Sequence, residues 1–285
     1  MQDYKDFVNT LVKTFEDAKH LPLGDVTNRP EPETTGDAPC AILMSPHPDD
    51  ECIIGTLPLR LMHRNKFQVT NIAVTQGSRK DRQGARFKEL QQACRYLGFN
   101  LRQTQAGGLE KIKPSTRNND PTHWRTCVRT IADILQDIAP QVLFLPHAQD
   151  WNGTHIGTHF LVMDALSMMP SDFTCTIIET EYWQPMPDPN LMIESTPEIL
   201  AELITALSFH KGEVARNPYH LSLPAWMQDN VRRGGELVGG QGEAAPDFHF
   251  ATLYRVSRWE QGTMTRSNPT TSIVPESNSF DLPQQ

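Results

Sequence analysis

The sequence lacks three features that would place its function in other classes of protein. Its formal net charge of -8 argues against the basic face that a sequence-independent nucleic-acid binder needs. No apolar run approaches membrane-spanning length, and residues 1–6 carry acids instead of the basic and then apolar segments of a signal peptide. These absences predict a cytoplasmic protein with no nucleic-acid partner and no membrane span.

Paired cysteines with metal-binding or redox spacing are also missing. The five cysteines form no CxxC pair and mostly fall within expected strands or helices, so we expect buried thiols and no disulfides. What the chain has is the composition of a soluble enzyme, with 38% hydrophobic and 21% charged residues. Its 285 residues are enough for a sizeable core.

Short apolar runs alternate with helical patterns along most of the chain. Buried strands are expected at residues 40–44, 69–74 and 142–145, and helices with an apolar stripe at residues 85–97 and 122–138. This alternation predicts an α/β fold that is doubly wound, with a mainly parallel sheet, right-handed crossovers and helices on both faces.

We expect a single α/β domain over residues 1–262. It begins with an amphipathic helix over residues 3–19, which is expected to pack outside the sheet, and a connector that runs to residue 38. Residues 263–285 are rich in Thr, Ser, Asn, Pro and Gln, and this composition predicts a mobile C-terminal tail.

The most informative stretch follows the first expected strand. His47, Asp49, Asp50 and Glu51 lie within five positions where that strand leaves the core, and in an open α/β sheet ligands bind at this edge. Carboxylates this close raise one another's pKa unless a cation compensates them, and a divalent metal ion would do so. Glu51 is interpreted as an internal hydrogen-bond acceptor that holds the loop.

A second polar segment follows the strand at residues 142–145. It contains His155 and His159 and leads into a helix expected to begin at Phe160. The two histidines are four residues apart, which on a helical turn places both imidazoles on one face. Because both polar segments leave strands at the same edge of the sheet, we expect them to converge.

Together these residues predict metal-assisted hydrolysis of an amide. Two imidazoles and one carboxylate can hold Zn²⁺ and leave its fourth position for water, and we choose His47, Asp50 and His159 as the ligands. Asp49 is then the general base, and His155 as a cation would stabilise the oxyanion or protonate the leaving nitrogen. The same ligand set also accepts Fe²⁺ or Co²⁺.

Residues 47–51 (His-Pro-Asp-Asp-Glu), placed after an apolar strand, resemble the signature of the PIG-L/LmbE-like zinc-dependent N-deacetylases. Residues 75–78 (Thr-Gln-Gly-Ser), Arg86 and the histidine-containing loop before a helix follow in the family's order. The resemblance covers residues 40–170.

The resemblance implies a Rossmann-like domain that removes an acetyl group from an N-acetylglucosamine-type amine, with zinc on the three chosen ligands and Asp49 as general base. Arg86 is then expected to contact the substrate, and Asp150 is assigned to substrate binding as well. The partner is thus a small-molecule amide, and a homo-oligomer is left open.

One departure concerns the second motif. The family usually spaces its histidines three apart, as His-x-x-His, whereas His155 and His159 are four apart. This leaves His147 and Asp150 as alternatives for the role of His155. Two other functions stay open: an amidase that acts on a non-sugar or thiol-conjugate amide, and a metal-binding or sugar-binding homologue without catalysis.

Overall fold

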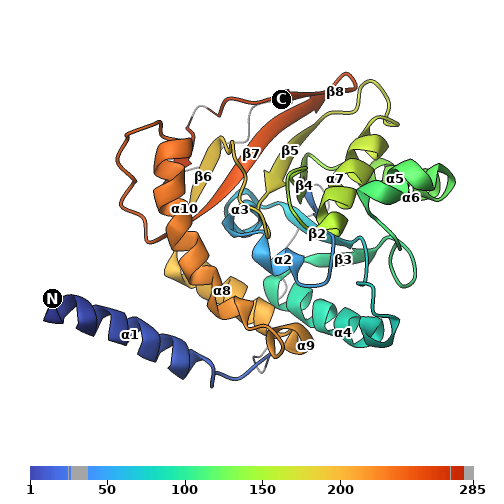
Figure 1. Cartoon of the computed structure of the whole chain (residues 1–285). Coiled ribbons are helices and arrows are strands. Elements are labelled where there is room, and N and C mark those ends of the chain that lie inside the picture. Colours follow the sequence, from blue (N-terminus) through green and yellow to red (C-terminus); the bar gives the residue numbers. More distant parts are fainter. Residues whose placement is uncertain (25, 27–37, 270, 279–285) are drawn as a thin grey trace.

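A nine-stranded sheet forms the centre of the molecule (Figure 1). The computed structural model of the chain describes residues 1–24, 26, 38–269 and 271–278. The strands are β1 (Cys40–Ser45), β2 (Gln68–Ala73), β3 (Asn100–Gln103), β4 (Val142–Pro146), β5 (Cys175–Thr180), β6 (Leu191–Ser195), β7 (Phe250–Glu260), β8 (Thr263–Arg266) and β9 (Ile273–Val274).

The described residues form ten α-helices, most of which cover the sheet or connect its strands. They are α1 (Gln2–Ala18), α2 (Asp50–Ile53), α3 (Thr56–Asn65), α4 (Lys80–Leu97), α5 (Pro114–Asn119), α6 (Pro121–Ile138), α7 (Gly153–Leu166), α8 (Pro197–Ser208), α9 (Lys211–Val214) and α10 (Leu223–Leu237), with a short 3₁₀ helix, η1 (Tyr219–Leu221).

The strand order is β3-β2-β1-β4-β5-β7-β6-β9, and β8 pairs with β7. β3, β2, β1, β4 and β5 are parallel, whereas β7 runs antiparallel to both β5 and β6. The chain leaves β1 toward β2 on one side and returns as β4 on the other side. The strand order therefore reverses between β1 and β4, and their carboxyl ends border the crevice where open α/β sheets bind ligands.

The two faces of the sheet bury separate hydrophobic clusters, which β1 shows residue by residue. Ala41 and Leu43 belong to the cluster that includes residues of α3, α4 and α8. Ile42 and Met44 belong to the cluster that includes residues of α6 and α7. Alternate side chains of a strand point to opposite faces, so helices cover both faces. The predicted doubly wound, mainly parallel α/β fold is confirmed.

The two ends of the chain differ from the expectations. α1 forms as predicted but buries none of its residues, so it does not pack on the sheet. Residues 263–266 and 273–274, expected in a mobile tail, form β8 and β9 and pair with β7 and β6. β9 joins the sheet because Val274 is fully buried there. Most of the predicted connector and residues 279–285 lie outside the described residues.

In the part of the chain that the structure describes, none of the helices has both the length and the apolar character that a membrane crossing requires.

Candidate active site

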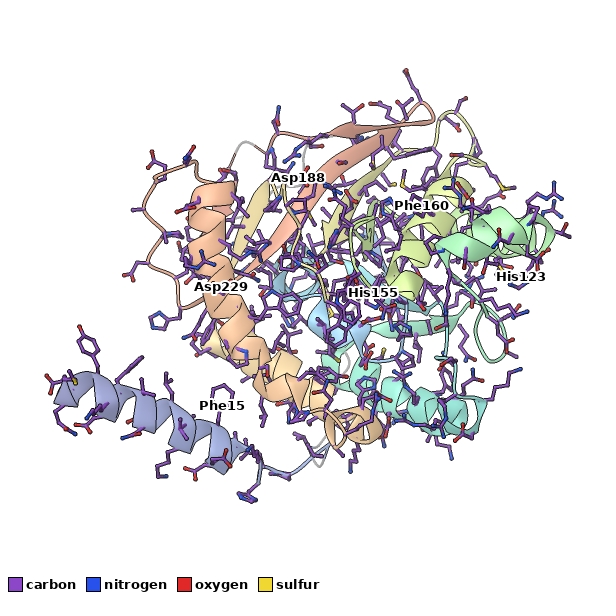
Figure 2. All side chains as sticks on the ribbon, in the orientation of Figure 1. Phe15, His123, His155, Phe160, Asp188 and Asp229 are labelled. Carbon is purple, nitrogen blue, oxygen red and sulfur yellow. The ribbon has the colours of Figure 1, made fainter. Side chains whose placement is uncertain are left out.

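Three side chains from two different loops meet at the crevice between β1 and β4. His47 follows β1, Asp50 is the first residue of α2, and His155 lies in the first turn of α7. His47 Nδ1 lies 3.2 Å from His155 Nε2, and Asp50 Oδ2 lies 3.3 Å from the first nitrogen and 3.4 Å from the second. Figure 2 shows His155 near the middle of the molecule. The convergence of the two loops expected from the sequence is therefore present.

The triangle formed by His47, Asp50 and His155 fits a divalent metal ion. Ligands about 2.0–2.1 Å from a tetrahedral zinc ion lie about 3.3–3.4 Å from one another, close to the spacing of these three atoms. The three residues form a group that could hold a metal ion. Asp50 Oδ1 is buried and has no hydrogen-bond partner among the described residues. Two imidazoles and one carboxylate, one oxygen of which is unpaired, are a donor set that suits zinc and related ions.

The charges around the triangle also favour a cation. Burial lowers the pKa of His155, but the carboxylates of Asp50 and Asp150 outweigh burial and raise that pKa to about 10. Burial raises the pKa of Asp50, whereas His155 and His47 together bring it well below its usual range. The cluster thus stabilises a positive charge between its carboxylates, and a divalent ion would supply one.

Asp49 lies beside the triangle and is not part of it. Tyr219 donates a hydrogen bond of 2.6 Å to Asp49 Oδ2, and Arg86 Nη2 lies 3.5 Å from the same oxygen. Among the described residues Oδ1 makes no hydrogen bond, so it is the oxygen that can accept a proton. Burial, followed by the charge of Asp50, raises the pKa of Asp49 to about 6.

The backbone of Asp49 is strained, and Glu51 holds it. Its φ of +114° is a region that residues with a Cβ rarely adopt. The Asp49 amide donates to Glu51 Oε2 at 2.9 Å, and His210 Nε2 donates to Glu51 Oε1 at 2.7 Å. Glu51 is therefore the internal acceptor expected from the sequence. It connects His210 in the α8–α9 turn to the backbone of Asp49.

The structure does not bring His159 into the triangle. Its Nδ1 donates to the carbonyl oxygen of Pro146 at 2.9 Å and lies 3.5 Å from Glu179 Oε1. Burial lowers the pKa of His159. Of the two histidines in α7, the structure thus places His155, and not the predicted ligand His159, beside His47 and Asp50.

Two further predictions differ from the arrangement in the structure. Asp150, assigned to substrate binding, is buried behind His155, with Oδ2 3.4 Å from His155 Nδ1. A carboxylate there orients the ring so that Nε2 faces the triangle. His147, an alternative for oxyanion stabilisation, is fully buried, and its ring nitrogens bind the backbone of Gln149 and Gln184.

A cavity of about 480 Å³ opens beside the triangle. His47, Arg86, Thr75 and Thr154 are among its lining residues. Arg86 donates a hydrogen bond of 2.8 Å to the carbonyl oxygen of Pro48, so its guanidinium borders both the cavity and Asp49. Through His47 the triangle borders a volume large enough for a small molecule.

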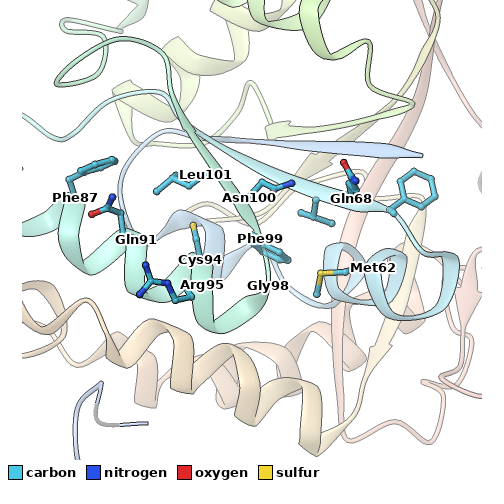
Figure 3. Close-up of a pocket in the computed structure, with 12 residues that line it drawn as sticks. Met62, Gln68, Phe87, Gln91, Cys94, Arg95, Gly98, Phe99, Asn100 and Leu101 are labelled. Atoms are coloured by element: carbon cyan, nitrogen blue, oxygen red, sulfur yellow. The ribbon is translucent and has the colours of Figure 1, made fainter. Parts of the chain in front are cut away.

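Another cavity, of about 380 Å³, lies at the opposite edge of the sheet (Figure 3). Gln68, Val69, Asn100 and Leu101, at the amino ends of β2 and β3, contribute to its lining. Ligands of open α/β sheets bind at the carboxyl ends of the strands. We therefore place the candidate site at the triangle and not in this cavity.

Comparison with known families assigns the segment that carries the triangle. Residues 42–166 match the PIG-L family, described as GlcNAc-PI de-N-acetylase. This segment is a PIG-L domain. It begins within β1 and ends at the last residue of α7, so it contains the three clustered side chains and Asp49.

Solved structures with the same fold match a larger part of this chain than the PIG-L segment does. The N,N'-diacetylchitobiose deacetylase of Pyrococcus horikoshii matches with 17% identity and a TM-score of 0.56, over 85% of this chain and 92% of that chain. GalB, the 4-carboxy-2-hydroxymuconate hydratase of Pseudomonas putida, matches with 13% identity and a TM-score of 0.59, over 76% and 95%. The zinc-inhibited form of a teicoplanin deacetylase matches with 14% identity and a TM-score of 0.53, over 81% and 100%. No curated protein matches the chain significantly.

The PIG-L domain of this chain lacks the first histidine of the His-x-x-His motif. In a His-x-x-His motif that ended at His155, that histidine would stand three residues earlier, where the chain has Asn152. The Asn152 side chain accepts a hydrogen bond of 2.9 Å from the Thr154 amide and caps α7. This position therefore begins a helix and supplies no imidazole.

Sequence reasoning missed two tyrosines beside the triangle and Asp49. Tyr182 follows β5 and packs edge-on against His155 with ring centroids 4.8 Å apart, and Tyr219 binds Asp49. Tyr182 could have been found, because β5 ends at the same edge of the sheet as β1 and β4. Tyr219 had no signal, because it comes from η1, far along the sequence and outside the strand pattern.

Proposed function

We propose that the chain is a divalent-metal-dependent hydrolase that removes an acetyl group from an N-acetylated amino sugar or its conjugate. The observation that carries this proposal is the triangle of His47, Asp50 and His155 with an uncoordinated carboxylate, Asp49, beside it. Zinc is the ion we propose, and Fe²⁺ or Co²⁺ would suit the same ligands.

Each residue has a separate task in this proposal. An ion bound by the triangle would activate a water molecule and polarise the amide carbonyl. Asp49 accepts the proton of that water through Oδ1 and passes it to the leaving nitrogen, while Tyr219 and Arg86 hold Oδ2. Asp150 keeps His155 in the orientation that presents Nε2.

The amino-sugar substrate is supported by the names of similar proteins. The family description is GlcNAc-PI de-N-acetylase, and a solved structure with this fold is a deacetylase of N,N'-diacetylchitobiose. A hydratase has the same fold, so the fold alone does not fix the reaction. The reaction is argued from the ligands and Asp49. The cytoplasmic location stays a prediction, and the question of a homo-oligomer stays open.

The test is acetate release from N-acetylglucosamine and N,N'-diacetylchitobiose by the zinc-loaded protein, with and without a chelator. We expect release that the chelator abolishes and zinc restores. Asp49→Asn should lower kcat by about 1000-fold, the range typical of a lost general base, and should keep about one zinc ion per chain. Asp172→Asn is the matched control, since this carboxylate is exposed and outside the site.

Three outcomes would contradict the proposal. Full turnover by Asp49→Asn would remove Asp49 as the base. Acetate release only from peptidic or thiol-conjugate acetamides would favour the alternative amidase. Sugar binding without acetate release, with zinc present, would favour a homologue without catalysis.

A further inference from the structure

The cavity beside His47 carries a surplus of positive charge. Its lining contains a single acid, Glu110, and four basic residues: Lys80, Arg86, Lys111 and Lys113. Lys80 pairs with Glu110 at 3.1 Å. Within the described part of the chain, Lys111 and Lys113 make no ion pair. Two uncompensated cations thus face one cavity in a chain whose net charge is -8.

Residues 108–113, which we call the lysine segment, are packed closely on both sides. A Cβ on Gly157 in α7 would lie 2.5 Å from the carbonyl oxygen of Ile112, and a Cβ on Gly108 would lie 3.0 Å from the backbone of Thr75. Lys111 has a φ of +58°, which is uncommon for a residue with a long side chain. The backbone is therefore fixed against α7 and against the loop after β2, and it presents the lysines from a defined position.

Two other cavities of similar volume do not share this charge. Arg95 is the only charged residue that lines the cavity of Figure 3 in the described chain. In a third cavity, of about 400 Å³, Asp229 pairs with Arg232 and Arg233 pairs with Glu181. Among these three cavities, and within the described residues, two unpaired cations line only the cavity beside the triangle.

We propose that this cavity binds an anionic group of the substrate, a phosphate or a carboxylate, through Lys111 and Lys113. This inference rests on the proposed function and narrows its substrate class. His47 lines the same cavity, so the anion and the scissile amide belong to one molecule. Because the acyl group is an acetyl, the anion lies on the amine half. The substrate class is an N-acetylated amino sugar that carries a negative charge.

The first test measures binding without turnover. Isothermal titration calorimetry should show that glucosamine 6-phosphate binds about tenfold more tightly than glucosamine, since charge-assisted hydrogen bonds are stronger than neutral ones. Added salt should reduce this difference, because the two lysines are exposed. The double variant Lys111→Asn/Lys113→Gln should abolish it. Asparagine is chosen because it tolerates the left-handed backbone of Lys111.

The second test measures kcat/KM for N-acetylglucosamine, its 6-phosphate and N-acetylmuramic acid, which separates neutral, phosphate and carboxylate substrates. We expect about a tenfold preference for one anionic substrate, which the double variant loses and the control Lys88→Gln keeps. Lys113→Gln alone is the second variant. The Lys113 side chain makes no capping hydrogen bond to α5, so this change removes no helix cap. Lys88 lies on α4 outside the cavity.

The outcomes separate this inference from the proposed function. Equal binding of glucosamine and its 6-phosphate, or equal binding by the native protein and the double variant, would overturn the anion site. Lysine-dependent binding without acetate release from any substrate would support the anion site and overturn the deacetylase.

Discussion

At the scale of single residues, two histidines one helical turn apart have different environments. His155 faces the carboxylates of Asp50 and Asp150, whereas Nδ1 of His159 binds the backbone carbonyl of Pro146. Four residues advance about 6 Å along a helix axis, so the two rings cannot occupy the same position. Residue type and spacing alone therefore do not tell which histidine is the ligand.

Replacing each histidine by asparagine separates the two roles. Asparagine places an amide near the position of Nδ1 and removes Nε2, so it can keep the contact of His155 with Asp150 and that of His159 with Pro146. His155→Asn should weaken zinc binding by about 100-fold or more, since losing an outer-shell partner alone costs 10- to 100-fold. His159→Asn should bind zinc with nearly native affinity. Competition with a chromogenic chelator measures both affinities.

The reverse pattern, with zinc lost in His159→Asn and kept in His155→Asn, would restore the ligand set predicted from the sequence. Circular dichroism of both variants shows whether either change acts through loss of folding.

At the scale of elements, sequence patterns predicted which strands and helices form better than the residues at which each of them begins and ends. The buried runs that form β1 and β4 were evident, because both faces of these strands are covered and nearly every residue is apolar. The beginning of α7 was placed at Phe160, seven residues late. Its cap, Asn152 followed by Gly153, was a usable signal, but Gly157 and the polar residues between them favour a loop.

Gly157 is in the helix because α7 packs directly on the lysine segment. A Cβ at this position would lie 2.5 Å from the carbonyl oxygen of Ile112, so Gly157→Ala must displace the helix or the segment. We expect a loss of about 1–3 kcal/mol in the free energy of unfolding, as for other overpacked sites. Urea denaturation of the zinc-loaded protein measures it.

Gly153→Ala is the matched control in the same helix. A Cβ there has no atom within 4 Å, so stability should stay the same or rise by up to about 1 kcal/mol. Equal stability of the two alanine variants would contradict the close packing of α7 on the lysine segment.

At the scale of the whole molecule, composition misjudged both ends of the chain. The amphipathic pattern of α1 suggested packing, yet the helix exposes its apolar side chains, including Phe15 (Figure 2). The polar C-terminal segment suggested mobility, yet it forms β8 and β9. The C-terminal segment also contacts Arg60, a buried cation on α3. A contact between residues so far apart in sequence leaves no local pattern.

Removing the C-terminal segment should therefore destabilise the protein. Arg60 is 1% exposed, and its guanidinium donates to the carbonyl oxygens of Pro275 and Asn278. Deletion of residues 271–285 leaves this cation without those partners and uncovers the strand next to β9. A buried charge that loses its partner typically costs about 3–5 kcal/mol, so we expect a loss of at least about 3 kcal/mol. Urea denaturation measures it.

Two further variants identify the cause. Arg60→Met in the truncated chain should recover part of the loss, because an apolar side chain of similar length needs no polar partner. Deletion of residues 1–18 should leave the free energy of unfolding unchanged, because α1 buries no residue. If the C-terminal deletion left stability unchanged, Arg60 would have found other partners. If Arg60→Met gave no recovery, the loss would come from the uncovered edge of β6, which β9 pairs with along Met192 and Ile193.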